Sequence, residues 1–207
     1  MSKLKFNEIK KIAKESGFDI NEDMMIGADY FDVYHYHEWD HGYDFGSGFS
    51  GARREFYADM KEMMDFLLDY ISLCGITEFI EAPLDRYNQF TQYPYVPYTE
   101  IKDIYFEIND FLKKYNVKKN SQSGVRLKVE QNTHIIEMIL EGAYRNVSDI
   151  CLFFPEQSVI IEPTHHFNLI FLTNNFIKEK EIVIKLLEKH PNLRYCEGKY
   201  GVWSEDV

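Results

Sequence analysis

The second half of the chain alternates short apolar segments with short turns, and this pattern constrains the fold more than any other feature of the sequence. The turns are brief, as in PEQ at 155–157 and PTHHF at 163–167. Connections of this length join neighbouring antiparallel strands. We therefore expect an antiparallel sheet, with strands near residues 125–129, 135–140, 149–154, 158–161, 168–173 and 193–197.

Apolar side chains recur at helical spacing mainly in the first half of the chain. Ser50 is suited to cap the start of the longest of these segments, and Gly75 is suited to end it. The fold class that we predict is α+β, with helices mainly in the N-terminal half and an antiparallel β-meander plus a helix in the C-terminal half. The predicted helices cover residues 4–16, 52–74, 101–116 and 175–189.

The length of 207 residues fits one large domain. The polar segment VKKNSQSG at 117–124 is the clearest linker candidate in the chain. We therefore expect a single domain, within which residues 1–116 would form a helical, acidic subdomain and residues 125–207 a sheet with one helix.

Negative charge is concentrated near the beginning of the chain. Residues 15–52 contain nine acidic side chains and no Lys or Arg, and the whole chain has a formal net charge of −11. Such a surface repels phosphate backbones and attracts basic partners, so we expect no nucleic-acid binding. Three scattered Cys without a C-x-x-C motif are typical of reduced thiols, and no apolar run is long enough for a membrane span. These features predict a cytoplasmic protein.

The segment ADYFDVYHYHEW at 28–39 alternates in a way that is typical of a strand. Phe31, Val33 and His35 fall on one side, and Tyr30 and Asp32 fall on the other. Tyr side chains are enriched at protein interfaces, and carboxylates around them would steer a basic protein toward the surface. Our leading hypothesis is therefore a non-catalytic, acidic binding protein that occludes a basic partner, which is the physical profile of an immunity or antitoxin protein. In this hypothesis Asp29, Asp32, Glu38, Asp40 and Asp44 steer the partner, and Tyr30, Tyr34, Tyr36 and Tyr43 anchor it.

The same segment supports an alternative hypothesis, a metal-dependent hydrolase. His35 and His37 lie two residues apart, so on a strand both imidazoles would point to the same side. His41 and either Asp44 or Asp40 would complete the coordination shell of a divalent metal held there. The string resembles the H-x-H-x-D-H signature of the metallo-β-lactamase family, with one additional residue before Asp40. The leading hypothesis expects no cofactor.

A glycine-rich loop supports a third and weaker hypothesis. GSGFSG at Gly46–Gly51 matches G-x-G-x-x-G between a predicted strand and a predicted helix, where backbone N–H groups can bind phosphate. The surrounding carboxylates oppose an anionic ligand. A nucleotide-binding protein is the function that this loop would imply.

Overall fold

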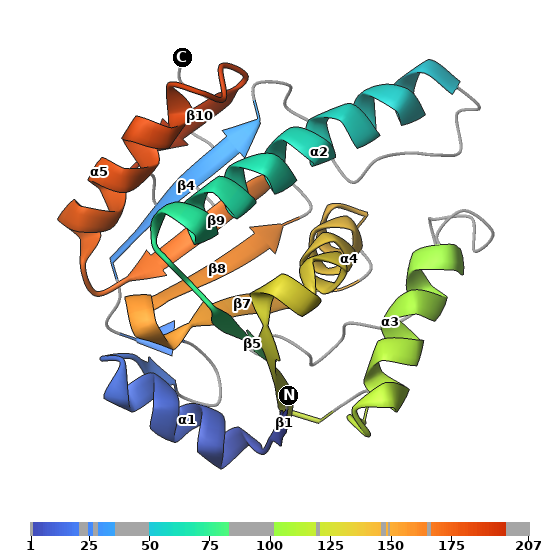
Figure 1. Cartoon of the computed structure of the whole chain (residues 1–207), viewed down its shortest axis with the longest axis vertical. Helices are drawn as coiled ribbons and strands as arrows, with labels where there is room; N and C mark the ends of the chain where they lie inside the picture. Colours follow the sequence, from blue (N-terminus) through green and yellow to red (C-terminus); the bar gives the residue numbers. More distant parts are fainter. Residues whose placement is uncertain are drawn as a thin grey trace.

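The computed structural model describes residues 2–20, 25–26, 29–35, 50–82, 102–118, 121–145, 148, 150–164 and 167–197 (Figure 1). The helices in these ranges are α1 (Phe6–Glu15), α2 (Ser50–Leu73), α3 (Lys102–Lys114), α4 (Thr133–Tyr144) and α5 (Phe176–Leu187). The strands are β1 (Ser2–Leu4), β2 (Asp19–Ile20), β3 (Met25–Ile26), β4 (Asp29–His35), β5 (Glu78–Ala82), β6 (Gly124–Lys128), β7 (Cys151–Phe154), β8 (Val159–Thr164), β9 (Asn168–Thr173) and β10 (Leu193–Cys196). Helices and antiparallel strands thus occur together, and the predicted α+β class is confirmed.

Eight of these strands form one antiparallel sheet in the order β1-β6-β5-β7-β8-β9-β4-β10, and β2 pairs with β3 in a separate hairpin. The consecutive strands β7, β8 and β9 are neighbours, as their short connections predict. The rest of the sheet departs from sequence order, since β5 lies between β6 and β7, and β4 lies between β9 and β10. Strands from before and after residues 117–124 therefore contribute to the same sheet.

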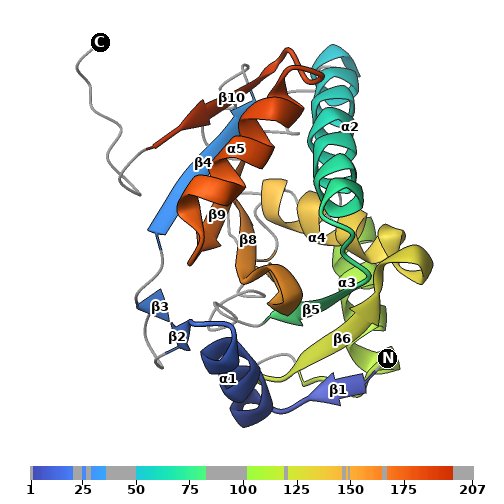
Figure 2. The same ribbon diagram turned by 60° about the vertical axis from the view of Figure 1, so that its left-hand side comes forward.

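Four helices pack on one face of the sheet and form the larger core. The buried stripe of α2 includes Phe56, Met63, Leu67 and Tyr70, at the spacing of an amphipathic helix. Side chains from α3, α4 and α5 join the same cluster, together with inward-facing residues such as Phe171 of β9. Figure 2 shows α2, α4 and α5 on this face. The sheet and these helices are held together mainly by this apolar contact.

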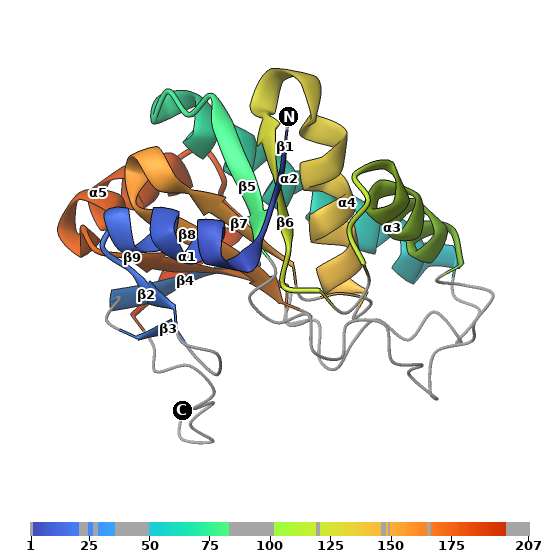
Figure 3. The ribbon, with the colours of Figure 1, turned by 90° about the horizontal axis from the view of Figure 1, so that it is seen from below.

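The opposite face carries α1 and a smaller core. Ile9 and Ala13 of α1 pack against Ile80 of β5 and Phe153 of β7, whose neighbours along the strands point into the larger core. The Glu8 carboxylate accepts the backbone N–H of Lys5 at 2.7 Å at the start of α1. Figure 3 shows α1 and the β2–β3 hairpin away from α2 and α4. The sheet is therefore covered by described helices on both faces, but more extensively on one.

The predicted strand at 135–140 is wrong, because these residues belong to helix α4. Eight of the twelve residues in α4 are buried. A helix that is apolar on nearly all sides lacks the periodicity that distinguishes it from a buried strand. Helix α4 is buried in this way because it packs against both α3 and β8, and this burial explains the wrong prediction.

Strand β4 has the alternation that the sequence predicts, over the residues that the structure describes. Phe31, Val33 and His35 are buried, whereas Tyr30, Asp32 and Tyr34 are half-buried. The Phe31 ring stacks on Phe171 with centroids 5.0 Å apart. One side of β4 is therefore part of the larger core, and the residues on the other side are only half-buried.

Candidate functional site

The half-buried side of β4 gathers residues from three strands. Asp32 lies directly opposite Ile170 of β9 and Cys196 of β10, so all three side chains share one side of the sheet. Tyr30 and Tyr34 flank Asp32 along the strand and belong to neither of the cores that the described residues form. We call Tyr30, Asp32, Tyr34, Ile170 and Cys196 the Asp32 surface. It combines one carboxylate with two phenol rings and an aliphatic side chain that is only 2% exposed, Ile170.

The Asp32 carboxylate has a neutral partner and no cationic one among the described residues. The Asn168 Nδ2 donates to its Oδ1 at 3.5 Å, and Thr164 Oγ1 donates to the Oδ1 of the same amide. The Thr164 contact orients the amide so that its N–H groups face Asp32. Burial raises the pKa of Asp32 to about 6, and the Asn168 hydrogen bond offsets only part of this rise. Asp32 is therefore ionised at neutral pH, at a cost in free energy.

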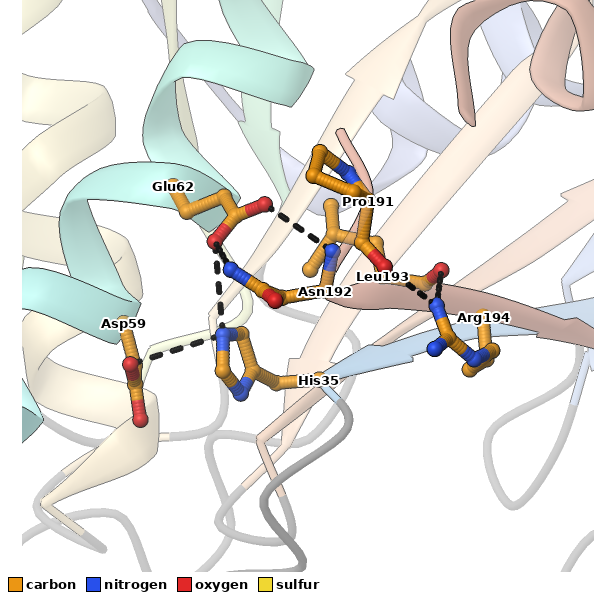
Figure 4. Close-up of polar contacts among 7 residues, drawn as sticks. All are labelled: His35, Asp59, Glu62, Pro191, Asn192, Leu193 and Arg194. Atoms are coloured by element: carbon orange, nitrogen blue, oxygen red, sulfur yellow. Dashed lines mark hydrogen bonds and ion pairs between the residues drawn. The ribbon is translucent and has the colours of Figure 1, made fainter. Parts of the chain in front are cut away.

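The nearest cation across the strand pairing is directed elsewhere. Arg194 of β10 lies opposite Tyr34, and so diagonally from Asp32. Its Nη1 donates to the carbonyl oxygens of Pro191 at 2.5 Å and Leu193 at 2.8 Å, as Figure 4 shows. The guanidinium is thus engaged by the turn that precedes β10, and the Asp32 charge is not balanced by it.

On the core side of β4, His35 lies between two carboxylates of α2. Its Nε2 is 3.5 Å from Asp59 Oδ1 and 3.5 Å from Glu62 Oε2, and its side chain is 1% exposed (Figure 4). Asn192 Nδ2 also donates to Glu62 Oε2, at 2.8 Å. Because the ring is buried, this arrangement fits a link between β4 and α2 and gives little access to a substrate.

A second histidine contacts a single carboxylate further along α2. His190 Nε2 is 3.4 Å from Asp69 Oδ2, and its ring packs edge-on against Phe66 with centroids 5.5 Å apart. Asp59 and Glu62 are three residues apart and Asp69 follows seven residues later, so all three fall on one stripe of α2. The stripe therefore presents carboxylates to histidines from β4 and from the turn before β10.

The predicted metal site is represented in the described residues by His35 alone. His37, His41 and Asp44 lie outside the described residues, as does the turn pair His165–His166. Within the ranges that the structure covers, no group of three His, Cys, Asp or Glu side chains converges as a metal ion would require. The His35 ring instead faces Asp59 and Glu62. The metal hypothesis receives no support from the geometry of His35.

The predicted partner-binding residues divide into three groups. Tyr30, Asp32 and Tyr34 are brought together on the Asp32 surface, whereas Asp29 is exposed at the start of β4 on the side of Phe31. The remaining members, which are Glu38, Asp40, Asp44, Tyr36 and Tyr43, lie outside the described residues, as do residues 46–49 of the glycine-rich loop. Three of the nine predicted residues thus share one side of the sheet.

Sequence reasoning missed the residues that complete both sites. Asn168, Ile170 and Cys196 reach Asp32 only through the pairing of β4 with β9 and β10. Asp59 and Glu62 face His35 only because α2 crosses the end of β4. The spacing of Asp59 and Glu62 on α2 was the one available signal, since it places both carboxylates on one side of the helix.

Comparison of the chain with protein-family models, with curated proteins and with solved structures finds no match in any of the three. Within the described part of the chain, every helix is too short or too polar to cross a membrane.

Proposed function

We propose that this protein is an acidic binding protein that occludes a basic protein partner through the Asp32 surface. The observation that carries the proposal is the state of Asp32, which is half-buried, flanked by two Tyr and without a cationic partner among the described residues. A carboxylate held in this way raises the free energy of the folded chain, because it has lost water without gaining a counter-charge. A cation from a partner would recover that free energy on binding.

The composition of the Asp32 surface suits a protein partner better than a small ion. Tyr30 and Tyr34 offer rigid rings with a polar tip, which is the chemistry enriched at the centres of protein interfaces. Cys196, which is exposed, lies beside the carboxylate on β10. The formal net charge of −11 would accelerate the approach of a basic protein at low ionic strength. A partner seated there would have its own basic surface covered, as an immunity or antitoxin protein requires.

Affinity capture from a native cell extract, with paired baits, tests this proposal. Wild-type protein, Asp32→Asn and Asp29→Asn would be immobilised at equal density, and the captured proteins compared by quantitative mass spectrometry. Asp29, which the sequence hypothesis counted among the steering acids, lies on the other side of β4 and outside the Asp32 surface. Asp29→Asn therefore removes the same charge from the same strand and is the matched control. We expect a basic protein that is enriched on wild type and on Asp29→Asn but depleted on Asp32→Asn.

The thiol of Cys196 gives an independent measure of where the captured protein lies. Cys196 is exposed and sits directly opposite Asp32, whereas Cys151 is buried and Cys74 is half-buried. Bound partner should slow the alkylation of Cys196 and leave the rates at the other two thiols unchanged. A captured protein that ignores the Asp32→Asn change and does not protect Cys196 would place the interface elsewhere and contradict the proposal.

A further inference from the structure

We propose that the Asp32 surface receives an arginine side chain of the partner, whose guanidinium pairs with the Asp32 carboxylate and stacks on the ring of Tyr30 or Tyr34. This inference rests on the proposed function and specifies the chemistry of the contact. It follows from the spacing of the three side chains, from the surroundings of the carboxylate and from the position of Arg194.

The spacing along β4 suits a group that pairs and stacks at the same time. Tyr30 and Tyr34 each lie two residues from Asp32, which on a strand corresponds to about 6.6 Å. A guanidinium attached to the carboxylate would therefore lie within about 6 Å of a neighbouring ring, which is the range of a favourable cation–π contact. One guanidinium could therefore contact the Asp32 carboxylate and a tyrosine ring at the same time.

The surroundings of Asp32 favour arginine over lysine. Ile170 lies against the carboxylate and is 2% exposed, and Asn168 contributes a single hydrogen bond of 3.5 Å. An ammonium group is strongly hydrated and loses that water when it enters such a site. A guanidinium is more weakly hydrated, and its planar fork can donate two parallel hydrogen bonds to one carboxylate. The site is therefore suited to arginine by hydration as well as by shape.

Within the described part of the chain, Arg194 does not pair with Asp32. It is the nearest arginine across the β4–β10 pairing, yet its guanidinium donates to the carbonyls of Pro191 and Leu193 (Figure 4). Those two hydrogen bonds hold the cation at the turn, on the Tyr34 side of the surface. An arginine from a partner would meet a carboxylate that has no cationic partner among the described residues.

Fluorescently labelled hexa-arginine and hexa-lysine peptides, which carry equal charge, are the probes that test the inference. Their binding to the full chain would be followed by fluorescence anisotropy near neutral pH in about 0.15 M NaCl, where long-range attraction is largely screened. We expect hexa-arginine to bind about tenfold more tightly than hexa-lysine, which corresponds to one stacked, forked contact. The Asp32→Asn variant should lose this preference, and the Asp29→Asn control should keep it.

Each outcome separates the inference from the proposed function. Equal affinity of the two peptides, with both weakened by Asp32→Asn, would overturn the arginine inference and leave the basic-partner proposal standing. Binding that is independent of Asp32, or no binding of either peptide, would count against both. Protection of Cys196 from alkylation by hexa-arginine in the wild-type chain provides a readout that needs no variant, and its absence at saturating peptide would also overturn the inference.

Discussion

The two sides of β4 differ in the interaction partners that surround their polar side chains. On the core side, His35 meets two carboxylates from α2, and Phe31 stacks on Phe171. On the other side, Asp32 meets only the amide of Asn168 among the described residues. The same seven-residue strand thus carries one polar side chain with charged partners and one that has none among the residues that the structure covers.

This difference teaches that polarity alone does not mark a functional residue on a strand. In the sequence, His35 belongs to the cluster of three histidines that supported the alternative hypothesis of a metal-dependent hydrolase. The structure buries it and places two carboxylates of α2 beside it, an arrangement that fits a link between β4 and α2. Asp32 is one acid among many in the sequence, yet its environment raises its free energy and leaves it in need of a cation. We therefore take a carboxylate that has no cationic partner in the described ranges as the better indicator of a binding role.

The largest effect that we expect distinguishes the two sides by stability. Phe31→Ala removes a fully buried ring that packs on Phe171, Phe176 and Tyr195, and should lower the free energy of unfolding by about 3–5 kcal/mol. Tyr30→Ala, one residue away on the half-buried side, should lower it by only about 1 kcal/mol. Urea denaturation of both variants measures the difference. Similar losses would mean that the two sides of β4 are packed alike.

A smaller loss of stability is expected when the histidine link is removed. His35→Ala leaves Asp59 and Glu62 without the ring between them and should cost about 2–3 kcal/mol of unfolding free energy. His190→Ala is the matched control, since it breaks a single contact to Asp69, whose side chain is 46% exposed. We expect this variant to lose about 1 kcal/mol or less.

The metal content of the same proteins decides between a structural and a metal-binding role for His35. We expect elemental analysis to give the same metal content for wild type and His35→Ala. A stoichiometric divalent metal that is lost in His35→Ala and retained in His190→Ala would contradict the structural role and favour the metal-dependent hydrolase.

Much of the fold followed from local patterns, because the elements concerned are amphipathic. The alternation in β4, the stripe of α2 and the short turn between β7 and β8 each depend on residues close together in the sequence. Helix α4 was mistaken for a strand because burial on nearly all sides removes its periodicity. Local sequence pattern therefore predicts the type of an element reliably where one side of that element is exposed to solvent.

The sites were less predictable, because they depend on pairing between distant strands. The sequence placed Tyr30, Asp32 and Tyr34 on one side of a strand, and the structure agrees. It could not show that β4 would insert between β9 and β10, which alone brings Asn168 and Cys196 to Asp32. Nor could composition show that Asp32 differs from the other acids, since the difference is one of burial and of missing counter-charge.

The smallest effect that we expect concerns the dependence of stability on pH. The folded pKa of Asp32 is raised from 3.8 to about 6, so the folded state holds the proton more tightly than the unfolded state does. The penalty is absent at pH values below the unfolded pKa, grows between about pH 4 and 6, and is complete above pH 6. The full shift would correspond to about 3 kcal/mol. Because Asp32 is only half-buried, solvent screening should reduce this to about 1 kcal/mol.

The Asp32→Asn variant removes this penalty and should therefore be more stable than wild type by about 1 kcal/mol above pH 6. The advantage should shrink toward zero as the pH falls to about 4, because wild-type Asp32 then becomes neutral in both states. Urea denaturation at several pH values measures it, and Asp29→Asn controls for the general effect of removing an acid from this strand. A variant less stable than wild type at neutral pH would show that the chain itself supplies Asp32 with favourable charge, and the reason to expect a cationic partner at this surface would disappear.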